Sequence, residues 1–128
     1  MEQAPLNVLI IEDNSGDALL EEIALAEQDF PSIVHRSING DEAIAHLGAA
    51  PVDLVLLDGI LDGEPGLEVL RRIKTDSVRP DVPVVIVTGS ERQRDREEFL
   101  ANGAAASLYK RTTFEELVSE LGALKRFT

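Results

Sequence analysis

Residues 52–63 read VDLVLLDGILDG, and the apolar run at 54–57 leads directly into Asp58. A second carboxylate, Asp62, follows four residues later. A continuous apolar run of this kind is typical of a strand buried on both faces, as in a parallel sheet. A carboxylate at the end of such a strand is costly to bury without a partner. Either Asp58 therefore binds something at the edge of a sheet, or the chain turns into solvent there.

Apolar runs alternate with helical patterns along the rest of the chain. The predicted strands are 6–11, 32–38, 52–57, 82–87 and 106–109. The predicted helices are 18–27, 39–48, 66–74, 91–103 and 112–127. Short links between alternating strands and helices predict a parallel sheet with helices on both faces, a (βα)5 three-layer α/β sandwich. We expect one domain over residues 1–128, with the sheet order 2-1-3-4-5.

Helical spacing predicts which helix faces are buried. The residues in these stripes are Leu19, Ile23 and Ala26 in the first helix and Phe114, Leu117, Val118 and Leu121 in the last. Thr113 and Glu116 are placed to form a capping box at the start of the last helix.

The composition excludes several classes of protein. The 128 residues carry 12 Lys and Arg against 24 Asp and Glu, a formal net charge of −12, which repels phosphate backbones and argues against direct nucleic-acid binding. The absence of cysteine excludes disulfides and thiolate metal sites. No apolar run approaches the roughly 20 residues that span a bilayer. We therefore expect a cytoplasmic protein with no membrane partner.

Polar residues follow the predicted strands where each strand ends. They are Glu12 and Asp13 after the first, Asp58 after the third, Thr88 after the fourth and Lys110 after the fifth. With the order 2-1-3-4-5, the chain reverses direction across the sheet between strands one and three, and ligands bind at such points. The three carboxylates are then expected to converge there.

Three converging carboxylates repel one another unless a cation is present, and oxygen ligands of this kind suit Mg²⁺. Lys110 and Thr88 add a positive charge and a hydroxyl donor. An aspartate carboxylate can act as a phosphoryl nucleophile. The five residues together predict a phosphoryl group attached to Asp58 and stabilised by charge.

The chain resembles the receiver domain of two-component response regulators. The matching segments, in order, are IIEDN at 10–14, DLVLLD at 53–58, GLEVL at 66–70, VVIVTGS at 84–90, NGA at 102–104 and Lys110. The EDN-x-x-D opening is similar to single-domain regulators, including those that partner phytochrome-type sensor kinases. The resemblance implies a flavodoxin-like fold.

The resemblance also implies a role for each residue of the pocket. Asp58 matches the phospho-acceptor, Asp13 the direct Mg²⁺ ligand, and Glu12 an acid that acts on the metal through water. The backbone carbonyl of Ile60 matches the remaining protein ligand. The phosphate-binding residues of the family are matched by Thr88, Gly89 and Lys110.

The function implied is that of a stand-alone response regulator without an output domain. A sensor histidine kinase or a phosphotransfer protein would supply the phosphoryl group, and the chain would catalyse only its own phosphorylation and dephosphorylation rather than act as an enzyme. Its output would come from binding a downstream protein, from a homodimer, or from passing the phosphoryl group on. The alternative is a phosphorylation-independent pseudo-receiver. A haloacid-dehalogenase phosphatase fits poorly because its acids are two residues apart, and EDNSGD would repel the phosphate of a flavodoxin-like FMN binder.

Three positions depart from the family pattern. Asp62 stands where proline is common, and Arg111 follows Lys110 where a cis proline is common, a bond that costs about 2.5–4 kcal/mol without proline. Ser107 stands where an aromatic switch residue is usual. Tyr109 comes directly before Lys110, so the side chains of these two residues should point to opposite faces of the strand. We therefore predict a family-like site with an altered signalling face that includes Ser107 and Tyr109.

For the other polar residues we expect simpler roles. Asp62 and Glu64 are expected in a solvated turn. His35 and His46 are expected to have no paired ligands with which to bind a metal. The basic residues Arg92, Arg94 and Arg96 alternate with Glu91, Asp95 and Glu97, which predicts an exposed helix laced with salt bridges.

Overall fold

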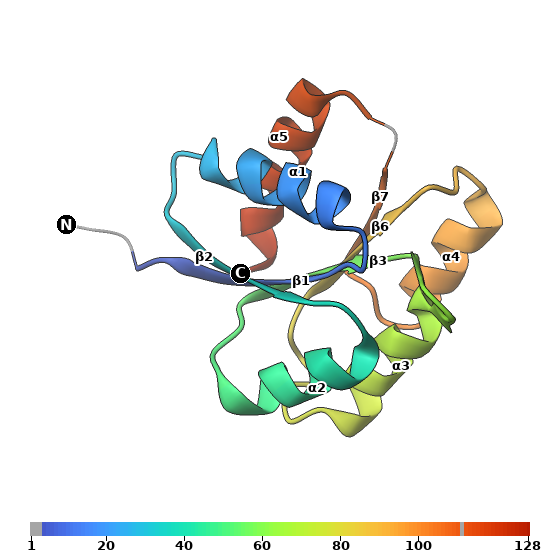
Figure 1. Ribbon diagram of the computed structural model, residues 1–128. Coiled ribbons are helices and arrows are strands. Elements are labelled where there is room, and N and C mark those ends of the chain that lie inside the picture. Colours follow the sequence, from blue (N-terminus) through green and yellow to red (C-terminus); the bar gives the residue numbers. More distant parts are fainter. Residues whose placement is uncertain (1–3, 111) are drawn as a thin grey trace.

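The computed structural model describes residues 4–110 and 112–128, which fold around one parallel sheet (Figure 1). The strands of this sheet are β1 (Leu6–Ile11), β2 (Ser32–Ser37), β3 (Leu54–Asp58), β6 (Val84–Thr88) and β7 (Ala106–Tyr109). Their order is β2-β1-β3-β6-β7 with parallel pairing throughout. The predicted order 2-1-3-4-5 is therefore confirmed, because the short strands β4 and β5 lie outside this sheet.

Helices cover both faces of the sheet (Figure 1). They are α1 (Ser15–Ala26), α2 (Gly40–Ala49), α3 (Gly66–Asp76), α4 (Gln93–Ala101) and α5 (Phe114–Ala123), and a 3-10 turn (Leu124–Phe127) follows α5. One apolar cluster joins the sheet to α1 and α5, and the other joins it to α2, α3 and α4. The predicted three-layer sandwich is confirmed.

Strand β3 lies at the middle of the sheet and is buried along its whole length. Val55 and Leu57 belong to the cluster under α2 and α3, whereas Leu54 and Leu56 belong to the cluster under α1 and α5. Successive side chains of a strand point to opposite faces, so a strand covered on both sides needs an unbroken apolar run. The same run brings Asp58 to the exposed edge of the core.

The segment after Asp58 is more ordered than the predicted solvated turn. Residues Ile60–Leu61 (β4) and Glu64–Pro65 (β5) form an antiparallel hairpin around Asp62 and Gly63. Gly63 has a positive φ of 70°, which glycine adopts without strain. Glu64 accepts a hydrogen bond from the Gly40 amide at 2.8 Å and lies 3.6 Å from Arg72. The expectation for Glu64 was therefore wrong: this side chain ties the hairpin to the start of α2 and to α3.

The predicted inner face of α1 is also wrong. Leu19 and Ile23 are 54% and 42% exposed, whereas Ala18, Glu21 and Leu25 are buried. A charged residue on the buried face hid this stripe from a reading by hydrophobicity. On α5, Leu121 is buried as predicted but Phe114 is 37% exposed, and Leu124 of the 3-10 turn is buried as well. The Thr113 hydroxyl accepts from the Glu116 amide at 3.1 Å, which confirms one half of the predicted capping box, whereas the Glu116 carboxylate accepts from the Thr112 hydroxyl.

Within the described ranges, no helix has the length and apolar character needed to cross a membrane.

Candidate functional site

The predicted carboxylates meet where β1 and β3 end side by side. Ile11 pairs with Leu57 in the sheet, so the residues that follow them emerge at the same edge. One oxygen from each of Glu12, Asp13 and Asp58 lies within 4.8 Å of the others. Glu12 and Asp58 are 2% and 8% exposed, whereas Asp13 faces solvent. The expected convergence of the three carboxylates is confirmed.

Lys110 reaches this cluster from the end of β7. Its Nζ lies 2.8 Å from Glu12, 2.8 Å from Asp17 and 3.2 Å from Asp58. Burial alone would lower the pKa of Lys110, but hydrogen bonds to Asp17 and Glu12 outweigh burial and raise the pKa above its ordinary value. The lysine is therefore a fixed positive charge in contact with the predicted acceptor.

Glu12 is the most buried acid of the cluster. Burial, followed by a hydrogen bond with Asp58, raises the pKa of Glu12 to about 7, although Lys110 opposes the shift. The Arg36 Nε donates to the backbone carbonyl of Glu12 at 2.8 Å and holds this segment at the end of β1. A bound divalent cation relieves the repulsion between carboxylates that lie this close together.

Asp13 is held by the hairpin that follows the acceptor. The backbone amide of Asp62 donates to Asp13 Oδ2 at 2.7 Å. A proline at this position would have no amide hydrogen to donate, so the departure from the family pattern has a visible structural result. The carboxylate keeps a second oxygen for another partner.

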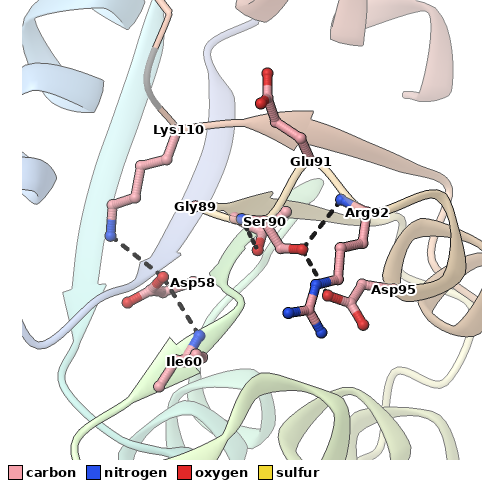
Figure 2. A pocket seen from close by; sticks show the side chains of 9 residues that line it. Asp58, Ile60, Gly89, Ser90, Glu91, Arg92, Asp95 and Lys110 are labelled. Carbon is pink, nitrogen blue, oxygen red and sulfur yellow. Dashed lines mark hydrogen bonds and ion pairs between the residues drawn. The ribbon is translucent and has the colours of Figure 1, made fainter.

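An open cavity of about 790 Å³ lies above Asp58 (Figure 2). The residues that line it are Asp58, Ile60, Thr88, Gly89, Ser90, Glu91, Arg92, Asp95 and Lys110. Thr88 is 7% exposed, and its hydroxyl accepts from the Ser90 amide at 3.1 Å. A Cβ on Gly89 would meet nothing within 4 Å, which leaves room beside the acceptor. The predicted acceptor, hydroxyl and lysine thus share one cavity.

The donor set suits a hard divalent cation. Its atoms are carboxylate oxygens, which Mg²⁺ and Mn²⁺ accept and which softer metals prefer less. Ile60 lies at the rim with 78% exposure, and a role for its carbonyl as a ligand stays a prediction.

Comparison with known proteins decides the family. The family model described as "Response regulator receiver domain" matches residues 8–122. The chain belongs to the response regulator receiver family. The fold, the sheet order and the acidic edge described above are those expected of a receiver.

Two of the similar curated proteins are transcriptional regulatory proteins. The phosphate regulon transcriptional regulatory protein PhoB of Escherichia coli K12 is 29% identical over 119 residues, which cover 93% of this chain and 51% of PhoB. The transcriptional regulatory protein TrcR of Mycobacterium tuberculosis is 32% identical over 123 residues, which cover 96% of this chain and 46% of TrcR. The receiver spans about half the length of these curated relatives.

Two solved structures are similar over nearly their whole length. The phosphorylated cyanobacterial phytochrome response regulator RcpA has a TM-score of 0.83 and 29% identity, covering 97% of this chain and 94% of that one. The Mn²⁺-bound form of response regulator Rcp1 has a TM-score of 0.80 and 26% identity, covering 96% and 94%.

Two acids of this receiver have no role in the sequence-based account. Asp17 pairs with Lys110, and it is the last residue of the EDN-x-x-D motif, so the signal was present. Glu21 lies one turn further along α1 and is 5% exposed. Burial, followed by the charge of Glu12, raises the pKa of Glu21 to about 8, and its Oε2 has no hydrogen-bond partner within the described part of the chain. A glutamate inside a helical pattern gave no warning of this burial.

The predicted signalling face lies beside α4. Ser107 and Tyr109 line a cavity of about 250 Å³ with Arg96, whose Nη1 donates to the Ser107 carbonyl at 3.2 Å. Tyr109 and Lys110 turn to different cavities, as the alternation along a strand predicts. Whether this face changes on phosphorylation stays a prediction, and the bond between Lys110 and Arg111 lies outside the described residues.

The rings of His35 and His46 lie 4.8 Å apart, and the expectation that these histidines have no paired ligands stays a prediction. A different expectation, the salt bridges of α4, is wrong. Among residues 4–110 and 112–128, no ion pair within 4.0 Å joins the alternating charges of Glu91 to Glu97.

Proposed function

We propose that this receiver accepts a phosphoryl group on Asp58 from a sensor histidine kinase or a phosphotransfer protein. The observation that carries the proposal is the convergence on one cavity of Asp58, two further carboxylates, the Lys110 ammonium and the Thr88 hydroxyl. No other function weighed from the sequence needs all of these groups together.

Each side chain has a task in this account. Asp58 supplies the attacking oxygen. Lys110 binds a phosphoryl oxygen, the Thr88 hydroxyl donates to another, and Gly89 leaves the space that the group fills. The lysine already contacts Asp58 at 3.2 Å, so only a small movement is required.

Mg²⁺ would be held by Asp13, Asp58 and the Ile60 carbonyl, with Glu12 acting through water. The metal would supply positive charge that neutralises the phosphoryl oxygens during transfer. Support comes from the carboxylate oxygens within 4.8 Å of one another and from Rcp1, which is described as Mn²⁺-bound.

Phosphorylation would shift the population of the domain and alter its partner-binding face, with Ser107 and Tyr109 as candidate residues. The similar protein RcpA is described as phosphorylated and as a phytochrome response regulator, which favours a related sensor kinase here. The receiver would act in the cytoplasm, without binding nucleic acid itself, through a protein partner or a homodimer. It would catalyse only its own phosphorylation and dephosphorylation, and the absence of an output domain stays a prediction.

The second candidate is a pseudo-receiver that signals by binding alone. The small Ser107 at the usual aromatic position favours it. The complete set of acceptor, carboxylates, lysine and hydroxyl at one cavity argues against it, because a pure binding module has no need to bury like charges together.

Intact mass spectrometry tests the proposal. The native chain, Asp58→Asn and Asp53→Asn are incubated with phosphoramidate, with and without Mg²⁺. Asp53 is the matched control because its carboxylate lies at the other end of β3, where it accepts from the Asn7 amide at 2.8 Å. We expect a gain of one phosphoryl group that requires Mg²⁺, persists in Asp53→Asn and is lost in Asp58→Asn. No gain in the native chain, under conditions that label another receiver, would favour the pseudo-receiver.

A further inference from the structure

The cavity above Asp58 contains a second cation that the account above does not use. Arg92 lies just before α4 and lines the same cavity as Asp58, Thr88 and Lys110. Figure 2 shows its guanidinium across the cavity from Lys110, pointing back toward the middle. A group attached to Asp58 would therefore lie between two cations.

Hydrogen bonds hold the backbone from which Arg92 projects. The Ser90 amide donates to the Thr88 hydroxyl at 3.1 Å, and the Arg92 amide donates to the Ser90 hydroxyl at 3.2 Å. The Ser90 hydroxyl in turn donates to Asp95 Oδ2 at 2.5 Å. This chain of contacts runs from the end of β6 into α4, so the position of Arg92 is linked to Thr88.

The charge of Arg92 is not taken up by an acid. Its side chain is exposed, and no carboxylate oxygen of the residues that the structure describes lies within 4.0 Å of its guanidinium. Arg71 and Arg72, by contrast, have ion pairs at 2.6 and 2.7 Å. Glu91 and Asp95 also line the cavity, and neither forms an ion pair within 4.0 Å of the Arg92 guanidinium.

Lys110 alone is poorly placed to balance an incoming phosphoryl group. It already contacts Glu12, Asp17 and Asp58. A phosphoryl group brings about two further negative charges at neutral pH. A guanidinium offers parallel donors that match two phosphate oxygens, which an ammonium does not.

Building on the proposed function, we propose that Arg92 is a phosphate-binding residue of the Asp58 site. It would bind the oxygens of the phosphoryl group in the donor and again on Asp58. In the reaction with phosphoramidate, an Asp58 oxygen forms a bond to phosphorus as the P–N bond breaks. Phosphoramidate reacts in its N-protonated form, so the electron pair of that bond remains on the –NH3⁺ nitrogen, which leaves as neutral ammonia, and Arg92 gains and loses no proton.

Four chains test this proposal: native, Arg92→Ala, Arg92→Lys and Arg94→Ala. Arg94 is the matched control because it is an exposed arginine on α4 that is absent from the lining of the cavities described for residues 4–110 and 112–128, and its removal changes the net charge equally. The readouts are the phosphoramidate concentration that gives half the maximal labelling rate, the dephosphorylation rate, and the affinity for beryllofluoride with Mg²⁺. Thermal melting checks that each variant is folded.

We expect Arg92→Ala to raise the half-saturating phosphoramidate concentration and weaken beryllofluoride binding by about tenfold, the effect of one charge-assisted hydrogen bond at a partly solvated site. Arg92→Lys should retain part of the native affinity for phosphoramidate and beryllofluoride, and Arg94→Ala should match the native chain. Equal behaviour of Arg92→Ala and the native chain, or an equal loss in Arg94→Ala, would overturn the proposal while leaving the acceptor role of Asp58 intact. A native chain that takes up no phosphoryl group would overturn both.

Discussion

At the scale of single residues, Lys110 decides whether the acidic edge of the sheet is stable. It is the cation in contact with two acids that are nearly inaccessible to solvent, Glu12 and Asp58. Removing one partner of a buried ion pair leaves the other charge without compensation, and this costs more than the pair contributes in total.

Lys110→Met should therefore destabilise the metal-free protein at neutral pH. The lysine side chain is 24% exposed, so we discount the value for a fully buried pair and expect about 1–3 kcal/mol. Urea denaturation measures it, with Arg94→Met as the control for loss of a surface charge. If the two variants lose equal stability, Lys110 is not balancing the cluster.

Glu21 should make the stability of the protein depend on pH. Its pKa is about 8 in the folded state because of burial, against an ordinary value of 4.5. The folded state therefore holds a proton that the unfolded state releases, so stability is fully present below about pH 4.5 and is lost as pH rises through about pH 8.

Glu21→Gln should remove the loss of folding stability that occurs as pH rises. We expect the variant to match the native chain near pH 5 and to exceed it by a few kcal/mol, on the order of 3, near pH 9. Denaturation midpoints across this range measure it. Glu22→Gln, one residue further along α1, should follow the native curve, and a Glu21→Gln curve parallel to the native one would contradict the assignment.

At the scale of elements, the turn from β3 through the hairpin to α3 sets the position of the acceptor. The Gly66 amide donates to the Gly59 carbonyl at 2.9 Å, and this brings the start of α3 against the residues that end β3. A Cβ on Gly66 would overlap the carbonyl of Asp58 and lie 2.7 Å from that of Gly59. Neither backbone atom can move without moving Asp58.

Gly66→Ala should thus lower the free energy of unfolding by at least about 2 kcal/mol and reduce phosphorylation of Asp58. The matched control is Gly48→Ala in α2, where an added Cβ meets nothing within 4 Å. That change should raise stability by about 0.5–1 kcal/mol because alanine favours a helix. Denaturant melts of both variants measure the difference, and a Gly66→Ala protein as stable as the native chain would refute the close approach.

Sequence reasoning succeeded for elements whose signal is local. The run before Asp58 predicted a central strand because burial on both faces requires it, and strand ends in a parallel sheet placed Glu12 beside Asp58. It failed where distant segments decide. The role of Glu64 depends on Gly40, which lies 24 residues away in sequence. The Asp62 amide donates to Asp13, which lies 49 residues away. Burial of Glu21 depends on how α1 packs, which no pattern within α1 reveals.

At the scale of the whole molecule, charge repulsion links metal binding to stability. The chain carries a net charge of −12, and three of its carboxylates, those of Glu12, Asp13 and Asp58, meet at one edge of the sheet. A cation that binds the folded state but not the unfolded one stabilises the fold by an amount that grows with the logarithm of its concentration relative to its dissociation constant.

Mg²⁺ at about 100 times its dissociation constant should stabilise the native chain by about 2.7 kcal/mol. Asp13→Asn should lose most of this gain, whereas Asp53→Asn should keep it, because Asp53 lies far along β3 from the cluster. Thermal melts with added Mg²⁺ and with a chelator measure the effect. Equal gains in all three chains would mean that the metal binds elsewhere.

The most direct test of the account is to locate the phosphoryl group on the chain. Borohydride reduces an aspartyl phosphate to homoserine, so peptide mapping after phosphorylation with Mg²⁺ identifies the acceptor. The account predicts homoserine at position 58 and at no other aspartate. Modification at Asp13 or Asp62 instead, or no modification of a chain that has gained a phosphoryl group by mass, would contradict it.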